Sequence, residues 1–518
     1  MFSSNLMILR KALRYPYGLP NLCAGVAMTG IQSFVLQKIK EKNNEHSNEF
    51  KNFIKRIEFI LKHINVNEIA INISQIKNNI KKSPKLFDMT EDARFMLELA
   101  CFMECVELYH NAHLYDQCLG GSVSQSEQEK IAYFVQPVEL EKHGGLITLT
   151  SFSGIYLLSE LTKYMGLMHH LARSRKIDLA LQLGSDNHAI AACYDYKQDA
   201  WNLIDLGSFS KAIISSSDKL AQKIFSSFES DDAELLCGFE TKFFAAGNNR
   251  EEMRAFIDAL IKEEVFISIH ALSLKRAQMS NERGVTLAHI MCFSGDNASL
   301  VKLVELQKGK DELVIDFNRA TDPDGLTPIL AAGSTGNLEA LKILASLRKT
   351  NGDMHVNFNG ASPNGAGLCY IAAATNQVAI LAFLASLKQN DAFIINFNAE
   401  NINGATPVYI AAQHDHIAAL KFLATLKHPD HTFVVNFNKA KINGTTPIQV
   451  AVAAGSIATL KFLAELKNPD GTPVINLDEK DRYGDTLDDI ARKFNQKEVE
   501  QLLSELRQNI LASQRPKR

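Results

Sequence analysis

The stretch GATPVYIAAQHDHIAALKFLATLKHPDHTFVVNFNKAKING, residues 404–444, decides the fold of the second half of the chain because it is one unit of a repeat. Glycines that precede the same short apolar pattern recur at intervals of 41, 40, 39, 40 and 40 residues. They are Gly284, Gly325, Gly365, Gly404, Gly444 and Gly484. A period this regular predicts a solenoid of stacked structural units.

Each unit is predicted to form two helices. Glycine permits a tight turn, Thr406 is suited to cap the first helix, and Pro407 suits the first helical position, where no N–H is needed. The pair Ala411-Ala412 allows close packing, and AALKFLATLK supplies the second helix. This pattern resembles the ankyrin repeat over residues 281–505, which implies an all-α ankyrin solenoid.

Two features depart from the usual ankyrin pattern. The third unit has Gly367-Leu368 where Thr-Pro is expected, and the period is about 40 residues rather than roughly 33. The surplus residues follow the second helix, as in KHPDHTFVVNFNKAKING, residues 427–444. Their Asn/Pro-Asp turns and alternating apolar residues predict enlarged β-hairpin fingers.

The fingers have two interpretations. In the first, the fingers line a concave surface that binds a protein partner, and the candidate binding residues are His428, Asp430, His431 and Phe433. Alternatively, their buried Val and Phe positions pair with neighbouring fingers and only stiffen the stack. Because a repeat array has no catalytic chemistry of its own, catalytic residues are expected before residue 240.

In the first half, a cysteine opens the apolar segment CAGVAMTGIQSFVLQKI, residues 23–39. Its spacing predicts a buried helix that starts at Cys23, since Pro20 ends any helix upstream. The partial positive charge at a helix N-terminus favours the thiolate form. Cys23 is therefore the candidate nucleophile, with Asn21 as a candidate oxyanion donor. The alternative is a buried cysteine that acts as a small hydrophobic residue.

The candidate base and its orienting acid come from one predicted hairpin, NHAIAACYDYKQDAWNLIDLGS, residues 187–208. A turn near Lys197 makes His188 and Asp205 cross-strand neighbours. Asp205 would orient the imidazole, and His188 would take the thiol proton. A rival nucleophile, Cys118, lies in YDQCLGGS, but a polar loop rather than a buried helix follows it.

A cysteine at the head of a buried helix, followed by NHAIAACYDY and WNLIDLGS, is similar to the papain-like fold and to the YopT-type cysteine proteases of bacterial effectors. The resemblance implies an α+β papain-like cysteine protease domain with the triad Cys23, His188 and Asp205. The long interval between the first two residues implies a helical insertion.

A papain-like domain followed by ankyrin repeats resembles the ankyrin-repeat effectors of intracellular bacteria such as Legionella. That resemblance implies virulence-related type IV secretion into a host cell and action as a thiol hydrolase on a host protein in the cytoplasm. The C-terminal sequence RPKR, residues 515–518, is interpreted either as a nuclear localisation signal or as a solvated tail.

Two other functions are open. The first is a non-catalytic ankyrin scaffold whose pseudo-protease domain modulates a host protein complex. The second is an acyltransferase or deamidase that uses the same triad, because water or an amine can resolve a thioester.

The predicted domains are residues 1–240 (protease domain), 241–280 (helical linker and cap), 281–505 (ankyrin repeats) and 506–518 (a tail that is a candidate secretion signal). With 22% charged residues and a net charge of −3, the composition is typical of a soluble globular protein that needs no direct nucleic-acid partner. The N-terminus does not read as a Sec signal, and no apolar run predicts a membrane span. The eight cysteines lack zinc spacing, so we expect no metal or cofactor, and we expect a monomer.

Overall fold

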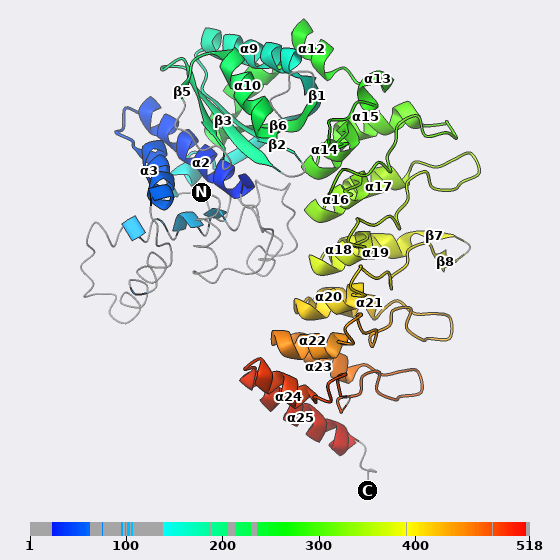
Figure 1. The fold of residues 1–518 in the computed structure, drawn as a ribbon. Helices are drawn as coiled ribbons and strands as arrows, with labels where there is room; N and C mark the ends of the chain where they lie inside the picture. The colour runs from blue at the N-terminus through cyan, green and yellow to red at the C-terminus, as the bar shows by residue number, and fades with distance from the viewer. Residues whose placement is uncertain are drawn as a thin grey trace. The chain divides into compact units, whose positions relative to one another are not determined.

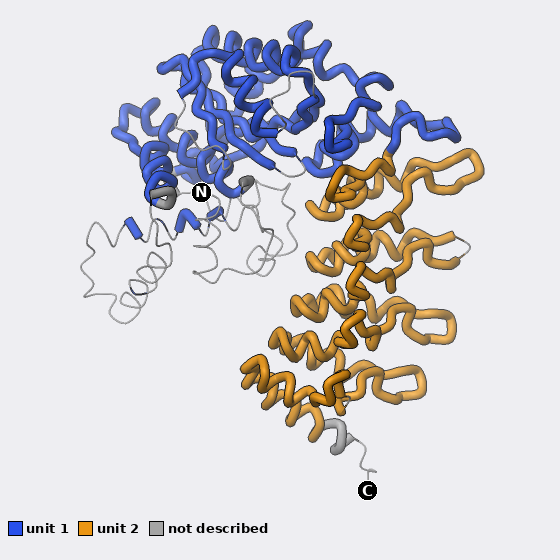
Figure 2. Tube along the Cα trace, viewed as in Figure 1, with its two compact units in different colours: residues 1–316 blue, residues 317–518 orange. Residues whose placement is uncertain are grey.

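The computed structural model describes residues 23–62, 138–185, 188–205, 213–228, 236–389, 391–478 and 480–513, with short helical pieces at 75, 95–96, 99, 101–103 and 105–106. Within these ranges, the side chains at 23–24, 60–62, 138–139 and 509–513 are outside the description. The chain divides into two compact units, residues 1–316 and 317–518 (Figure 2).

Unit 1 is built on a sheet of six antiparallel strands in the order β1-β6-β2-β3-β4-β5 (Figure 1). The strands are β1 (Leu146–Leu157), β2 (Leu179–Gly184), β3 (Ala189–Asp195), β4 (Ala200–Ile204), β5 (Ile213–Ile214) and β6 (Leu236–Ala246). β6, the last of these six strands in sequence, pairs with β1 along its length and with β2 on its other side. Every residue of β6 after the first is buried, and the strand joins β1 to the rest of the sheet.

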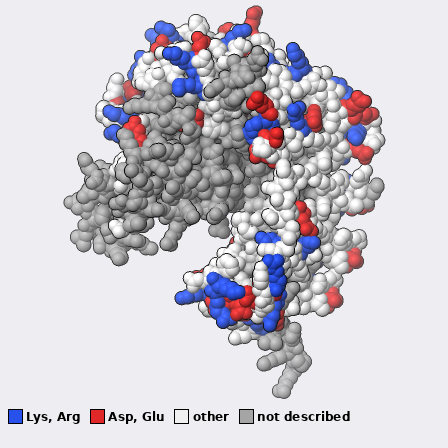
Figure 3. All heavy atoms as spheres, in the orientation of Figure 1, with Lys and Arg blue, Asp and Glu red and all other residues white. Residues whose placement is uncertain are grey.

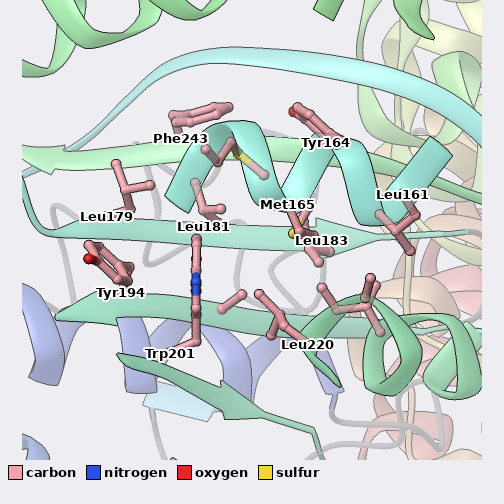
Figure 4. Packing of buried hydrophobic residues seen from close by; sticks show 14 of the residues in the cluster. Leu161, Tyr164, Met165, Leu179, Leu181, Leu183, Tyr194, Trp201, Leu220 and Phe243 are labelled. Carbon is pink, nitrogen blue, oxygen red and sulfur yellow. The ribbon is translucent and has the colours of Figure 1, made fainter. Parts of the chain in front are cut away.

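Four helices cover one face of the sheet and close the main core. They are α9 (Leu158–Arg175), α10 (Ser217–Phe228), α11 (Arg250–Leu260) and α12 (Glu264–His270). Figure 4 shows Trp201 and Leu181 of the strands together with Tyr164 of α9 and Leu220 of α10. The strands contribute alternate residues to this core, as expected when helices pack on a pleated surface.

The helix α2 (Cys23–Lys42) covers the other face, with α3 (Glu49–Lys62) and the short α8 (Val138–Glu141) beside it. β3 presents small buried residues, Ala189 and Ala191, on its second face. A Cβ atom at Gly30 would lie 2.4 Å from Ile204 Cδ1, so a larger residue at this position would require the Ile204 side chain to move. The span of α2 agrees with the helix predicted from Cys23.

The predicted boundary at residue 240 falls inside β6. Residues 241–246 complete this strand, and η2 (Gly247–Asn249), α11 and α12 continue the same core. The segment 241–280, which ends with α13 (Leu274–Ala277), is therefore part of unit 1 rather than a linker. Its helical apolar spacing, which suggested a repeat cap, serves to bury α11 and α12 against the sheet.

The first repeat also belongs to unit 1. Its helices α14 (Leu287–Ser294) and α15 (Asn297–Gln307) follow α13, and α14 packs on β1 and β6. The Ser153 N–H of β1 donates to Asp296 Oδ2 at 3.2 Å. The compact repeat unit thus begins one repeat later than residue 281.

Unit 2 stacks five pairs of helices. They are α16 (Pro328–Thr335), α17 (Leu338–Ala345), α18 (Leu368–Ala374), α19 (Val378–Ser386), α20 (Pro407–Gln413), α21 (Ile417–Leu423), α22 (Pro447–Ala454), α23 (Ile457–Glu465), α24 (Leu487–Lys493) and α25 (Lys497–Ser513). Side chains of Thr327, Thr406, Thr446 and Thr486 accept hydrogen bonds from the backbone N–H three residues on, as predicted for helix caps.

The surplus residues form short insertion hairpins, residues 348–354, 388–393, 427–433 and 467–473. One has the paired strands β7 (Lys388–Gln389) and β8 (Ala392–Phe393), and each of the others closes with a single bridge. The hairpins are thus present as predicted, although their regular pairing is short.

An asparagine ladder joins the repeats just after these hairpins. Asn318, Asn359, Asn398 and Asn438 each donate Nδ2–H to a backbone carbonyl of the next repeat at 2.7–2.9 Å. Three of them also accept a backbone N–H from that repeat at 2.7–3.0 Å. The side-chain amide thus pairs with the next backbone much as a peptide group would. The contacts at the base of the insertion hairpins therefore support the interpretation that these hairpins stiffen the stack.

The third unit lacks a side-chain cap, which generates a stabilising prediction. Gly367 precedes α18 with φ −86° and ψ 175°, a conformation that threonine also adopts. The nearest atom to an added Cβ is Gly360 O at 3.5 Å, so there is room. We expect Gly367→Thr to stabilise unit 2 by a few tenths of a kcal/mol, because glycine is itself a fair N-cap residue, and Thr406→Ala to destabilise it by about 1 kcal/mol.

Urea unfolding measures this effect. The single tryptophan, Trp201, lies in unit 1, so its fluorescence follows that unit, and the remaining circular-dichroism transition follows the repeats. If Gly367→Thr left the repeat transition unchanged while Thr406→Ala lowered it, α18 would not depend on a cap.

Gly365 is predicted to be required for stacking as well as for its turn. Its φ is +79°, and an added Cβ would lie 2.7 Å from Asn401 Cα in the next repeat. Gly352 has φ +87° but no atom within 4 Å of such a Cβ. We expect Gly352→Ala to cost about 1–2 kcal/mol for backbone conformation alone, and Gly365→Ala to cost clearly more. Equal losses in the repeat transition would show that Gly365 serves the turn only.

Candidate active site

His188 and Asp205 lie next to each other in the structure. His188 directly precedes β3 and Asp205 directly follows β4, whose register pairs Ala191 with Ile204. Continued by one step, this register sets Asp205 opposite Ile190, so it is the diagonal neighbour of His188. The Nε2 atom of His188 lies 2.9 Å from Asp205 Oδ1. The predicted pairing of these two side chains is therefore observed.

The carboxylate is held from a second side by α10. Ser227 Oγ donates to the other oxygen of Asp205, Oδ2, at 2.8 Å, and the side chain of Asp205 is 4% exposed. The imidazole of His188 packs edge-on against Phe228, with 5.7 Å between ring centroids. A buried carboxylate with both oxygens engaged gives the imidazole a defined orientation. Because Nε2 faces Asp205, Nδ1 is the ring nitrogen that would exchange a proton with a thiol.

The direction in which α2 runs brings its first residue, Cys23, to the end of the sheet where His188 and Asp205 lie. Lys38 of α2 bonds to Asp195 at the far end of β3, and Gly30 lies against Ile204, opposite Ala191. From Gly30 back to Cys23 is about 10 Å along a helix. From Ala191 back to His188 is also about 10 Å along a strand. The backbone of Cys23 is thus level with the His188–Asp205 pair along the direction of β3, but α2 covers one face of the sheet and Asp205 lies on the other, which α10 covers.

Three predicted residues lie partly or wholly outside the described structure. The side chain of Cys23 is not described, although its backbone opens α2. Asn21 and the rival Cys118 both fall in undescribed ranges. Ser227 and Phe228 were missed by sequence reasoning, because nothing in the amphipathic segment of α10 marks them as neighbours of Asp205.

A second imidazole–carboxylate pair has a different setting. In α9, His169 contacts Asp199 through Nε2 at 2.8 Å and Ser217 through Nδ1 at 2.9 Å. Both ring nitrogens are engaged, so His169 ties α9 to the β3–β4 turn and to the start of α10. It provides a matched reference for His188.

A buried charge cluster anchors the other end of α2. Lys38 Nζ lies 2.6 Å from Asp195 Oδ2 and 3.0 Å from Glu41 Oε2, beside a pocket of about 180 Å³. Asp178 also lines this pocket and accepts the Tyr196 N–H at 3.0 Å. Burial raises the pKa of Asp178 from its ordinary value near 3.8 to about 6, although Lys38 lowers it.

The raised pKa of Asp178 predicts a pH-dependent stability. The folded state binds this proton more tightly than the unfolded chain, so the free energy of unfolding falls as pH rises from about 4 to 6. We expect Asp178→Asn, which keeps an acceptor for Tyr196, to stabilise unit 1 by about 1–3 kcal/mol at pH 7 and to have no such effect at pH 4.

The measurement is urea unfolding followed by Trp201 fluorescence at both pH values. The control is Asp195→Asn, which removes the direct partner of Lys38 and should destabilise unit 1 at pH 7. A loss of stability in Asp178→Asn at pH 7 would contradict the prediction, since it would mean that the carboxylate is favourable as an ion.

The four candidate partner-binding residues lie on one insertion hairpin. His428, Asp430 and His431 are exposed and Phe433 is half-buried. Asp430 Oδ1 accepts from the Thr432 N–H and hydroxyl at 3.0 and 2.6 Å, which shapes the turn. Lys427 lies over the Phe433 ring, 5.0 Å from its centroid. The tip is thus accessible and locally ordered.

The comparison with protein families decides the nature of the repeats. The family model for ankyrin repeats, in three copies, matches residues 370–475. Residues 370–475 are ankyrin repeats. The ankyrin repeats indicate a protein partner, because such repeats serve protein–protein interaction. No curated protein matches the chain.

Two further observations concern partners and cofactors. Among the described residues, no group of three or more histidine, cysteine, aspartate or glutamate side chains is placed to hold a metal ion. None of the described helices combines the length and apolarity that crossing a bilayer needs. On the face drawn in Figure 3, basic and acidic side chains are interspersed rather than gathered in separate patches.

Proposed function

We propose that this protein binds a protein partner through its ankyrin repeats and acts on it as a cysteine protease-like thiol hydrolase. The observation that carries the proposal is the hydrogen bond of 2.9 Å between His188 Nε2 and buried Asp205. An imidazole that a carboxylate orients is what the activation of a thiol requires. This imidazole lies at the end of the sheet toward which the N-terminus of α2 runs.

The proposed reaction begins with proton transfer from the Cys23 thiol to His188 Nδ1. The thiolate attacks the carbonyl carbon of an amide or isopeptide bond, and Asn21 is proposed to stabilise the oxyanion. Asp205 stabilises the imidazolium, which then donates its proton to the leaving amine. Water hydrolyses the resulting thioester and regenerates the thiol.

The proposed partner surface includes the insertion hairpin with His428, Asp430, His431 and Phe433. Its support is the exposure of the tip above an asparagine ladder that holds the hairpin bases in place. Type IV secretion of the protein as an effector into the cytoplasm or nucleus of a host cell stays a prediction from the resemblance stated above.

A second candidate function is a non-catalytic scaffold with a pseudo-protease domain. It is favoured by the fact that the family match is confined to the repeats, residues 370–475. Acyl transfer or deamidation would use the same thiol chemistry and differs only in what leaves or resolves the thioester.

Thiol reactivity tests the catalytic proposal. The native protein is alkylated with limiting iodoacetamide from pH 5 to 9, and labelled peptides are identified by mass. Exposed Cys101 serves as an internal reference thiol. We expect Cys23 to react at least tenfold faster than Cys101 at pH 6, because a neighbouring imidazolium and a helix N-terminus both favour the thiolate.

The variants separate catalysis from structure. His188→Ala and Asp205→Asn should remove the advantage of Cys23, while His169→Ala, which breaks the other imidazole–carboxylate pair, should keep it. If Cys23 followed the pH profile of Cys101 in the native protein, the scaffold function would replace the hydrolase. If Cys118 reacted first, the nucleophile would be Cys118.

A further inference from the structure

Ser217 is hydrogen-bonded to His169 in an arrangement that the proposed thiol hydrolase does not use. The Ser217 hydroxyl lies 2.9 Å from His169 Nδ1, and Asp199 Oδ1 lies 2.8 Å from Nε2 of the same ring. An ionised carboxylate can only accept a hydrogen bond, so Nε2 carries the ring proton and donates it to Asp199. In the neutral ring Nδ1 is then the acceptor, and Ser217 donates its hydroxyl proton to it. The three side chains are thus connected in the order that a serine hydrolase needs.

The carboxylate of Asp199 is held by two further groups. The Tyr194 hydroxyl donates to Asp199 Oδ1 at 2.7 Å, and Arg173 Nη1 lies 3.2 Å from Oδ2. The hydrogen bonds from His169 and Tyr194 lower the pKa of Asp199 below its ordinary value of 3.8. Asp199 is therefore charged at neutral pH, where it can orient the ring and stabilise an imidazolium. It lies in the turn between β3 and β4 with φ +49°, a left-handed conformation that aspartate tolerates better than most residues.

The serine is accessible and lies beside free backbone donors. Ser217 opens α10 and is half-buried, and the side chains of His169 and Asp199 are 14% and 38% exposed. Within the described part of the chain, the N–H groups of Ser217 and Asp218 have no hydrogen-bonding acceptor, as is usual in the first turn of a helix. Such N–H groups can stabilise the oxyanion that forms when the serine attacks a carbonyl group.

This group of residues is separate from the His188–Asp205 pair. His188 directly precedes β3, whereas Asp199 lies in the turn that follows the strand. The seven residues of β3 span about 24 Å. The two imidazole–carboxylate pairs can therefore be inactivated separately.

We propose that Ser217, His169 and Asp199 form a second hydrolytic centre, which cleaves short-chain carboxylic esters independently of Cys23. Ser217 Oγ attacks the ester carbonyl carbon while its proton passes to His169 Nδ1. The C–O bond to the alcohol then breaks, and the imidazolium gives the proton to the departing alkoxide. Water, which loses a proton to His169, attacks the acyl-serine, so that the carboxylic acid leaves and the proton returns to Ser217 Oγ.

The setting of the centre indicates the substrate class. His169 and Asp199 are both partly exposed, so the centre encloses little of a substrate and contributes little binding energy to the reaction. An alkoxide leaves an ester more readily than an amine leaves an amide. An ester with a small acyl group is therefore the bond that such a centre can cleave.

Labelling of the full chain with a fluorophosphonate tests the nucleophile, because this reagent phosphonylates activated serine hydroxyls. Labelled peptides are identified by mass. The internal reference is Ser226, an exposed serine of the same helix whose hydroxyl donates to Gln222 O at 2.9 Å. We expect Ser217 to be labelled at least tenfold faster than Ser226, and both His169→Gln and Asp199→Asn to remove this advantage.

Ester cleavage is measured with p-nitrophenyl acetate on full-length Cys23→Ala, which lacks the candidate thiol nucleophile. We expect Ser217→Ala in this background to lower the rate at least tenfold. Ser226→Ala is the matched control and should change the rate by less than twofold. Urea unfolding followed by Trp201 fluorescence checks the fold, and a native unfolding midpoint in Ser217→Ala would assign its loss of rate to chemistry rather than to structure.

Three results would overturn the proposal. They are equal labelling of Ser217 and Ser226, labelling of Ser217 that survives both His169→Gln and Asp199→Asn, and an unchanged rate of ester cleavage in Ser217→Ala. Each would leave His169 as a structural tie between α9, the β3–β4 turn and α10. An inert Ser217 with a reactive Cys23 would exclude the second centre alone, and a labelled Ser217 in Cys23→Ala would keep it even if the thiol proved inert.

Discussion

The antiparallel register of β3 and β4 is the constraint on which the front site depends. A turn of fixed length between the two strands determines that Asp205 lies diagonal to His188. A shift of the register by one residue would turn one of the two side chains to the opposite face of the sheet. Because Lys38 bonds to Asp195 at the turn, the same hairpin also sets the position of α2 along the sheet. One local pairing therefore positions the base, its acid and the helix that carries the candidate nucleophile.

The repeats hold together by a different means. Each helix pair buries small and aliphatic side chains against its neighbours, and the loops bury apolar side chains of their own, such as Val435 and Phe437. The ladder of Asn318, Asn359, Asn398 and Asn438 adds directional contacts, since each amide bonds to the backbone of the following repeat. The loops thus cohere by apolar burial and by directional hydrogen bonds, whereas the helices cohere mainly by apolar burial.

Features with a local signature could be predicted from the sequence. Turns and helix caps are determined within a few residues, as at Gly404 and Gly444 and at the pair Thr406-Pro407. The helices of the repeats could therefore be predicted from these signals. The His188–Asp205 pair was predictable because a tight hairpin converts sequence separation into proximity. The role of β6 was not, since its place between β1 and β2 depends on pairing with strands more than 50 residues away. Ser227 and the contact of Gly30 with Ile204 were hidden for the same reason.

The unit without a cap has a mechanical consequence. In a stack where each repeat touches only its neighbours, the free energies of the units add nearly in sequence, and the weakest unit opens first. α18 begins at Gly367 without a threonine side chain at its start and without a proline at its first position, unlike α16, α20 and α22. Under tension applied at the two ends of the repeats, the stack should part at α18, and the blocks on either side should behave as two springs in series.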